Sequence, residues 1–470
     1  MSADATLGAT TDRALEAAAS GAGTAATPAQ TLRWLRAAAE RRVGVIATAS
    51  VPLIGLFICM AGTRTPVLVP QSIALWPLAS GMAGPLQYIG ISLSVGETVV
   101  ALMVLIAAYL AAIRYADQVP TRLTVWAIAA FTLIVLIGPP LFSTDVFSYQ
   151  AYARMFAHYH INPYVHGPDT IALDPIYNYV GAKWIATPSV YGPLFTFLSA
   201  VFAMTSVAFN EFAFKLIAAA ASAGTMVLIW KAAKRRGVSP ARGIALFGLN
   251  PMVTLYAVGG GHNDMLMLLL STAGVYATLL HRDRGAGALI TTSVAVKLTG
   301  AIVLPFALIS DAAHSRCRWR SFIVGTAAVT VLVATASYLA FGTGVLHLAS
   351  TLQTVQAEGA WQSLPGVVFS LARVPVAAGV RFADEALLAG IVLWLLWRVW
   401  KGRLDWIEAA AWATFAVLAT AWSLLPWYVC WLMPLVALTS ERRLWRVATV
   451  ATLMCSAIMI ATCFPSSGWL

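Results

Sequence analysis

The feature that most constrains the fold of this chain is a series of long segments without a charged residue. Residues 123–140 (LTVWAIAAFTLIVLIGPP) and 321–341 (SFIVGTAAVTVLVATASYLAF) are examples, and segments of this length can cross about 30 Å of hydrocarbon as a helix. Only 10% of the 470 residues are charged, whereas soluble domains carry about 25%. We therefore predict an all-α polytopic membrane protein.

The segments that we expect to cross the membrane follow one another over most of the chain. They lie near 43–62, 91–113, 123–140, 216–231, 242–258, 265–281, 321–341, 386–400, 407–425, 428–440 and 447–463. Two other apolar stretches do not fit as simple crossings. We expect residues 191–208 to lie along the outer face as a helix that starts at Gly192-Pro193. Residues 288–309 should form two short helices that meet near Lys297–Gly300. Counting that pair, the sequence predicts a bundle of about 13 transmembrane helices.

The net charge of +11 comes mainly from short basic runs between the apolar segments. These runs stand at 41–43, 231–237, 281–285, 314–320, 397–403 and 441–446. Positive residues of this kind mark the cytoplasmic ends of membrane spans, so we interpret them as orientation signals and not as a nucleic-acid site. The N-terminus is then inside and the C-terminus outside, and residues 141–215 and 342–385 form the main and the second outer loop.

The first 30 residues differ from the rest of the chain. Residues 1–30 are rich in Ala, Thr, Gly and Ser without an apolar core, which predicts a disordered cytoplasmic tail and not a signal peptide. Residues 31–42 (TLRWLRAAAERR) predict a short basic amphipathic helix that leads into the first span. Residues 31–470 are expected to form a single transmembrane domain.

Residues 141–168 (LFSTDVFSYQAYARMFAHYHINPYVHGP) interrupt the apolar chain with a polar and aromatic cluster. Ser143-Thr144 supplies a candidate helix cap, which would put Asp145 in a first turn where the helix dipole favours a carboxylate. An ionised Asp145 at the outer mouth of a span is suited to accept a proton from an alcohol; the alternative is a capping aspartate without chemistry. Tyr149 and Tyr152 would share the helix face of Asp145. Arg154 would point away, towards another partner, a phosphate or lipid headgroups.

The histidines of this cluster do not indicate a metal site. His158, His160 and His166 lack the i, i+4 pairing of a helical zinc site, and the five cysteines show no metal-binding or redox spacing.

A second polar group follows three glycines in GGGHNDMLM (259–267). His262, Asn263 and Asp264 together offer donors and acceptors for hydroxyl groups, and the glycines would allow close approach of a ligand. The alternative is a plain helix cap at Asn263 or Asp264. Lys297 is a lone cation in an apolar stretch, where a charged residue is a candidate functional site. It would either neutralise a phosphate or form a structural ion pair.

Aromatic residues stand near the C-terminal end in PWYVCWLMP (426–434). Trp427, Tyr428 and Trp431 fit an aromatic belt at the membrane interface. The alternative is that their rings stack on a sugar or contact an isoprenoid tail.

These motifs together resemble a known family. STDVFSYQAYARM, NPYVHGP, YGPLF, GGGHNDMLM, SVAVKLTG and PWYVCWLMPL occur in that order over roughly residues 40–440. FNEFAFKLIAAAASAGTMVLIWKAAKRRG (209–237) also resembles the helix after the outer loop in many lipid-phosphosugar transferases. The chain resembles the GT-C class of integral-membrane glycosyltransferases. More specifically, it is similar to the actinobacterial polyprenol-phosphate-mannose-dependent α-1,6-mannosyltransferases that build lipomannan cores.

The resemblance implies a catalytic transmembrane domain in the plasma membrane with its active site outside the cytoplasm. Such an enzyme would transfer mannose from a polyprenyl-phosphate donor to a glycolipid or lipoglycan acceptor, with inversion at the anomeric carbon. Asp145 occupies the position of the general base. GT-C enzymes often have two adjacent acids in this loop, but here only Asp145 is present, so Asp264 is the candidate for a second acid. Lys297 stands where such enzymes often contact the donor phosphate.

The resemblance and the residue types give one set of candidates for substrate binding: Tyr149, Tyr152, Arg154, His166, His262, Asn263, Lys297, Trp427 and Tyr428. We expect no cofactor, while the use of a divalent metal stays open. A transporter or flippase of a lipid-linked sugar is the alternative function. Transporters often contain an inverted repeat, and we find none in this sequence.

Overall fold

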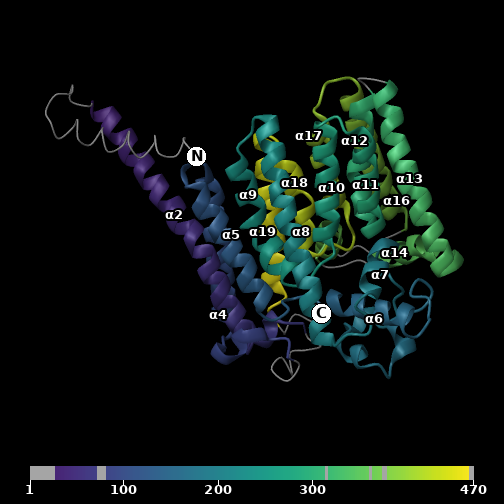
Figure 1. The fold of residues 1–470 in the computed structure, drawn as a ribbon. Coiled ribbons are helices and arrows are strands. Elements are labelled where there is room, and N and C mark those ends of the chain that lie inside the picture. Colours follow the sequence, from purple (N-terminus) through teal and green to yellow (C-terminus); the bar gives the residue numbers. More distant parts are fainter. Residues whose placement is uncertain (1–26, 71–80, 313–315, 359–361, 373–377, 465–470) are drawn as a thin grey trace.

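The computed structural model describes residues 27–70, 81–312, 316–358, 362–372 and 378–464, and the regular elements of these residues are helices (Figure 1). The first helices are α2 (Pro28–Gly62), α4 (Val95–Arg114) and α5 (Thr121–Ile137), with α2 packed against the other two. Thr27 and Gln30 form a capping box at the start of α2. The predicted basic helix at 31–42 is the first part of α2 and continues into the first span without a break.

The predicted disordered tail at 1–30 lies mostly outside the described residues. Its last residues, 28–30, belong to α2, because the cap at Thr27 begins the helix earlier than the sequence predicted. The helix is 35 residues long, which is about 52 Å at 1.5 Å per residue. It is therefore longer than the hydrocarbon core of a bilayer, and in Figure 1 its N-terminal end projects beyond the bundle.

The predicted main outer loop, 141–215, contains two complete helices, several short turns and the first residues of α8 (Val207–Arg236) at one end of the bundle (Figure 1). The helices are α6 (Asp145–Ala157) and α7 (Pro193–Ala200), which pack against each other. The turns are η4 (Pro168–Ile171), η5 (Pro175–Tyr179) and η6 (Ala182–Trp184). The predicted helix start at Gly192-Pro193 is confirmed, since Gly192 caps α7.

The centre of the bundle continues with α8 (Val207–Arg236), α9 (Pro240–Gly248), the π-helix η7 (Met252–Val258) and α10 (Asp264–Leu279). A bend of 42° separates α9 from η7. Pro251 has no N–H to donate at this bend, and Asn250 Oδ1 accepts from Met252 N at the start of η7. The side chain of Asn250 also donates to Tyr109 and Thr452, so the bend is held by α4 and α19 (Arg442–Ala461).

The prediction of two short helices in residues 288–309 is confirmed. Helix α11 (Asp283–Val296) ends before Lys297, which has extended backbone, and η8 (Leu298–Val303) and α12 (Leu304–Ala312) lead back. Gly192 N donates to Val296 O at 3.0 Å, so the start of α7 lies against the tip of this helix pair. A Cβ atom at Gly192 would lie 2.1 Å from Ala295 O, and only glycine permits this approach.

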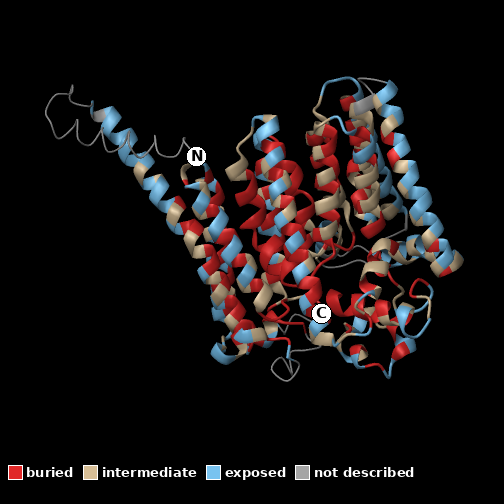
Figure 2. Cartoon of the chain, viewed as in Figure 1, coloured by how far each residue is buried: buried red, intermediate tan, exposed pale blue. Residues whose placement is uncertain are grey.

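The C-terminal part begins with α13 (Arg316–Phe341), η9 (Gly342–Leu346), α14 (His347–Glu358) and α15 (Leu364–Ala372). The remaining elements are α16 (Ala378–Trp400), α17 (Trp406–Thr420), η10 (Pro426–Trp431), α18 (Met433–Val436) and α19. The predicted second outer loop, 342–385, thus contains η9, α14, α15 and the start of α16. Figure 2 shows that α13 exposes one long side, whereas α10 and α18 lie in the buried centre.

Five described helices are long and apolar enough to cross a membrane: α2, α4, α8, α19 and a segment that starts with α13. The bent pair of α9 and η7 would make a sixth. Other apolar helices, such as α5 and α10, have only 10–17 residues. The all-helical, multi-pass membrane character is therefore confirmed, but the predicted number of about 13 crossings is not.

Most of the basic runs meet at one end of the bundle. Arg236 pairs with Asp405 at 3.0 Å and donates to Leu438 O, and Arg318 pairs with Asp283 at 3.1 Å. The polar motifs around residues 145, 262 and 297 lie at the opposite ends of the same helices. The grouping agrees with the charge pattern; which end faces the cytoplasm remains a prediction.

Candidate active site

Asp145 begins α6 after a turn that the surrounding backbone holds tightly. Phe142 has a left-handed conformation with φ 62°, which costs a residue other than glycine about 1–3 kcal/mol. Its N–H donates to Leu68 O at 3.0 Å, and its ring stacks on Tyr256 at 5.0 Å. Ser143, and not Thr144, provides the predicted side-chain cap, because its Oγ accepts from Asp145 N. The turn therefore fixes where the Asp145 carboxylate can lie.

The Asp145 carboxylate is nearly buried, with 10% of the side chain exposed. Among the described residues neither of its oxygens accepts a hydrogen bond. His262 Nδ1 lies 3.3 Å from Asp145 Oδ2. A buried carboxylate with free acceptor sites can take a proton from a hydroxyl group that enters next to it.

The three glycines before His262 form a tight turn after η7. Gly261 has φ 64°, and a Cβ atom at Gly259 would lie 2.1 Å from Leu255 O. This turn brings His262 into the gap between two carboxylates, with Nδ1 3.3 Å from Asp145 and 4.0 Å from Asp264. The imidazole also stacks against Trp427, with 4.0 Å between ring centres.

Asp264 is fully buried and has several donors. Lys297 Nζ donates to both of its oxygens at 2.8 and 2.9 Å, and Trp431 Nε1 donates to Oδ1 at 2.6 Å. The structural ion pair that the sequence left open for Lys297 is therefore present. A carboxylate already engaged by a cation and an indole is a poor proton acceptor, so Asp145 is better placed than Asp264 to act as a base.

Two predicted tyrosines lie on α6 in different surroundings. Tyr149 donates to Asn263 Oδ1 at 3.4 Å, accepts from Asn263 N at 3.3 Å, and so ties α6 to the start of α10. Burial raises the pKa of the Tyr149 hydroxyl, and the nearby Asp145 carboxylate raises it further, so the group stays protonated. Tyr152 instead donates to Thr187 O at 2.7 Å, within the outer loop.

Arg154 and His166 lie apart from this group. Arg154 pairs with Asp174 at 2.7 Å and donates to Thr205 O at 2.8 Å. It points away from Asp145, as the helical spacing predicted, and its partners are protein groups. His166 is exposed, and its N–H donates to Asn162 O within the outer loop. The structure therefore places both residues in the fold of the loop and not beside Asp145.

The predicted aromatic residues line the same site from η10. Trp427 is only 3% exposed and stacks between His262 and Tyr256, which does not fit an aromatic belt in contact with lipid headgroups. Tyr428 stacks on Trp431 at 4.2 Å, and the Lys297 ammonium lies 4.9 Å from the Tyr428 ring centre. The aromatic rings thus hold both the histidine and the ion pair.

Several buried polar atoms around Asp145 have no hydrogen-bond partner among the described residues. They are both ring nitrogens of His262, Nδ2 of Asn263 and Nε1 of Trp427. Buried donors without partners are costly. Their concentration beside one carboxylate indicates a place where a ligand rich in hydroxyl groups would supply the missing partners.

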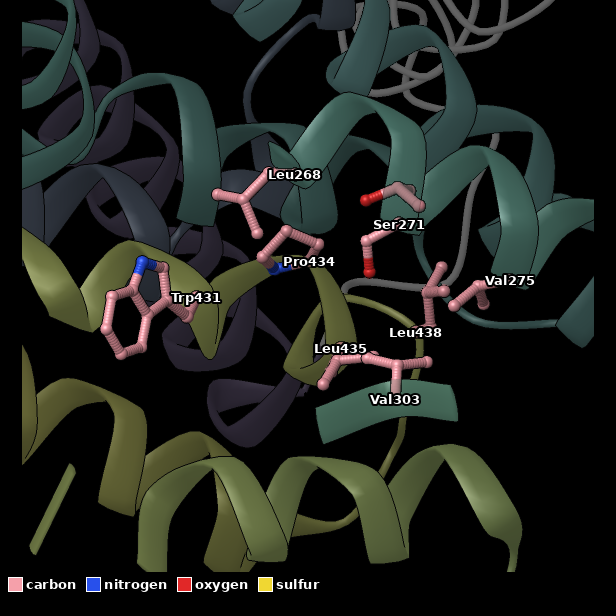
Figure 3. A pocket seen from close by; sticks show the side chains of 9 residues that line it. Leu268, Ser271, Val275, Val303, Trp431, Pro434, Leu435 and Leu438 are labelled. Atoms are coloured by element: carbon pink, nitrogen blue, oxygen red, sulfur yellow. The ribbon is translucent and has the colours of Figure 1, made fainter. Parts of the chain in front are cut away.

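A small cavity lies on the other side of Trp431, between α10, η8 and α18 (Figure 3). Its lining is mostly apolar, with Ser271 and Thr272 as polar groups, and its volume is about 20 Å³. This is space for one water molecule, so a sugar would not fit there. Among the described residues, no group of three His, Cys, Asp or Glu side chains is placed to hold a metal ion.

The sequence interpretation missed two participants, Glu211 and Lys215, and named Trp431 only as an aromatic residue. Trp431 stands in a motif that was recognised, but its bond to Asp264 could not be read from spacing. Glu211 and Lys215 form a buried ion pair at 3.3 Å on α8. Their i, i+4 spacing at the apolar start of a helix was a readable signal.

Comparison with known proteins identifies the family. The model described as "Alpha-(1->6)-mannopyranosyltransferase, N-terminal domain" matches residues 41–313, more than half of the chain, and the MptB C-terminal domain model matches residues 355–468. No solved structure matches the chain significantly.

Individual relatives agree with the family models. Alpha-(1->6)-mannopyranosyltransferase A of Mycobacterium tuberculosis is 30% identical over 341 residues, which are 66% of this chain and 64% of that enzyme. The enzyme of the same name from Corynebacterium glutamicum is 26% identical over 75% of this chain and 77% of its own length. Alpha-(1->6)-mannopyranosyltransferase B of C. glutamicum is 24% identical over 68% and 60%. The resemblance seen in the sequence motifs is thereby confirmed, and the chain belongs to the alpha-(1->6)-mannopyranosyltransferase family.

Proposed function

We propose that this chain is an inverting mannosyltransferase that uses a polyprenyl-phosphate donor and a glycolipid or lipoglycan acceptor and forms an α-1,6 linkage. The family supports the sugar and the linkage. The observation that carries the mechanism is the Asp145 carboxylate, which is nearly buried, free of hydrogen bonds among the described residues, and 3.3 Å from His262. A transporter or flippase of a lipid-linked sugar is not favoured, because the relatives are named as transferases.

The proposed reaction is a single displacement. The acceptor hydroxyl oxygen attacks the anomeric carbon of the donor and gives its proton to Asp145. The bond between that carbon and the phosphate oxygen breaks, and the electron pair leaves with the polyprenyl phosphate. A β-linked donor then gives an α-linked product. A positioned base of this kind contributes about 10²–10⁴-fold to the rate.

The remaining site residues would support Asp145. His262, fixed by Trp427, orients the carboxylate through Nδ1. Asn263 Nδ2 and Trp427 Nε1 are available to sugar hydroxyls, and Tyr149 holds Asn263 in place. Asp264 is held by Lys297 and Trp431, so we assign it a structural role and not that of a second base.

The ion pair also changes the proposal for Lys297. Its ammonium is bound to both oxygens of Asp264, and 12% of its side chain is exposed. Asp264 thus neutralises its charge, and we assign Lys297 a structural role instead of a contact with the donor phosphate. The site would face the outer side of the plasma membrane, because the basic runs lie at the opposite end of the bundle.

The experiment is a transfer assay with the full chain reconstituted in lipid. Polyprenyl phosphate carrying radiolabelled mannose is supplied with an α-1,6-linked oligomannoside acceptor, and the product is analysed for its linkage. We expect label in a new α-1,6-mannosyl residue. Label that only moves between the leaflets, with no new glycosidic bond, would contradict a transferase and favour the transporter.

A further inference from the structure

A buried ion pair lies behind the candidate active site, and the proposed chemistry does not use it. Glu211 and Lys215 stand one turn apart near the start of α8, with Oε1 and Nζ 3.3 Å apart and side chains 4% and 1% exposed. Charged groups inside a membrane helix are costly and are usually retained for function. This pair therefore needs an explanation beyond helix formation.

Lys215 binds the backbone that leads to Asp145. Its Nζ donates to Gly138 O at 2.5 Å and lies 3.5 Å from Pro139 O, where α5 ends. The next residues form the turn in which Phe142 has φ 62°. A strained turn keeps its conformation only when its surroundings hold it from several sides. Lys215 binds the backbone carbonyls at which this turn begins.

The other supports of this turn come from different elements. Leu141 N donates to Gly259 O at 3.4 Å, and Phe142 N donates to Leu68 O at 3.0 Å. The charge-assisted bond from Lys215 to Gly138 O, at 2.5 Å, is shorter than either of these two bonds.

The same turn of α8 also contacts the loop that carries His262. A Cβ atom at Gly261 would lie 3.4 Å from Lys215 N, which is van der Waals contact. The side chain of Lys215 thus holds the turn before Asp145, while its backbone packs on the turn before His262. Lys215 therefore lies against both turns that lead to two groups 3.3 Å apart in the site.

We propose that Lys215, through its bond to Gly138 O, is a positioning residue that sets the Asp145 carboxylate relative to His262 and the bound donor, while Glu211 balances its charge. Its side chain binds backbone carbonyls and Glu211, so it acts through the turn and not on the reacting atoms. This inference rests on the proposed role of Asp145 as the base.

The test compares Lys215→Met, Glu211→Gln and the double variant in the reconstituted full chain. Each preparation is measured for thermal stability, donor affinity and turnover at saturating donor, all per mole of monodisperse protein. Lys215→Met leaves Glu211 buried without a partner, so it loses stability as well as turnover. The double variant removes both charges, so it leaves no uncompensated buried charge and should be more stable than Lys215→Met.

A positioning role predicts that the double variant regains stability but not turnover, because Gly138 O still lacks its donor. The expected turnover loss is roughly 10- to 100-fold, since small misplacements of a catalytic group have effects of this size. Donor affinity should stay within about 3-fold of wild type. This change in binding free energy is smaller than the roughly 1.4 kcal/mol that corresponds to a tenfold change in affinity. Glu211→Gln keeps the bond from Lys215 to Gly138 and is the matched control: it should retain most of the turnover even if it is less stable.

Two results would overturn the positioning role. One is a double variant that regains turnover together with stability, and the other is a Glu211→Gln variant that loses as much turnover as Lys215→Met. The second result decides the question even if the double variant does not fold. A wild-type chain without transfer activity would instead refute the proposed function, so the two failures can be told apart.

Discussion

Replacement of Lys297 by methionine separates the two roles that the sequence allowed for this residue. Lys297 Nζ lies 2.8 and 2.9 Å from the two oxygens of Asp264, which is fully buried. Methionine keeps the volume but removes the charge, so Asp264 would be left with Trp431 as its remaining strong donor. Breaking one side of a buried pair costs about 3–5 kcal/mol. Because the Trp431 bond remains, we expect the lower end, about 3 kcal/mol.

The assay is denaturant-induced unfolding in mixed micelles, read by tryptophan fluorescence, with donor affinity measured in parallel. Asp264→Asn combined with Lys297→Met removes both charges and should recover most of the lost stability. Lys215→Met, which breaks the buried pair with Glu211, gives a comparison for the stability lost when one partner of a buried pair is removed. The reasoning would be refuted if Lys297→Met unfolded like wild type but bound the donor much more weakly, because the ammonium would then serve the phosphate.

Three further predictions concern other parts of the account. Arg154→Met should destabilise the outer loop by about 1–3 kcal/mol, because Asp174 and Thr205 O lose a charged partner. Donor affinity measured on the folded fraction should stay unchanged. A selective loss of affinity would show that Arg154 binds substrate. His262→Phe should keep the stacking on Trp427 but lower turnover about 10-fold or more through a less well oriented Asp145, and unchanged turnover would remove His262 from the mechanism. The topology can be tested with single cysteines in a background that carries Cys317→Ser. A cysteine at exposed Asn178 should react with an impermeant thiol reagent in intact cells, and one at exposed Lys401 should not. The reverse pattern would put the site on the cytoplasmic side.

The sequence predicted the parts of the fold that depend on local patterns. The break at Lys297 follows from basic loops on both sides of a short apolar stretch, and the start of α7 follows from Gly192-Pro193. The basic helix at 31–42 was predicted to lead into the first span, and α2 contains both; the capping box of Thr27 and Gln30 starts the helix a few residues earlier than predicted. Several apolar stretches form helices of only 10–17 residues, which are too short to cross a bilayer by length alone. For this reason the number of apolar stretches in the sequence exceeds the number of helices long enough to cross.

For the site, most participants could be predicted from the sequence, but their pairing could not. Asp145, His262, Asp264, Lys297 and Trp427 do lie together, because the motifs that contain them end the helices on the same side of the bundle. The bonds from Lys297 and Trp431 to Asp264 join residues 33 and 167 positions apart, and no local pattern contains that information. Arg154 and His166 were assigned by their proximity in sequence to Asp145, but helix geometry turns Arg154 to the opposite side and the loop carries His166 to the surface.

The most direct test of the central claim is transfer by Asp145→Asn in the reconstituted full chain. Asparagine keeps the size of the side chain but cannot accept the proton of the acceptor hydroxyl. We predict a loss of turnover of about 10²–10⁴-fold, with donor affinity and thermal stability near those of wild type, because Asp145 accepts no hydrogen bond among the described residues that the change would break. An Asp145→Asn variant that retained more than about a tenth of wild-type turnover would contradict the account, since the expected effect of a general base is at least about tenfold larger.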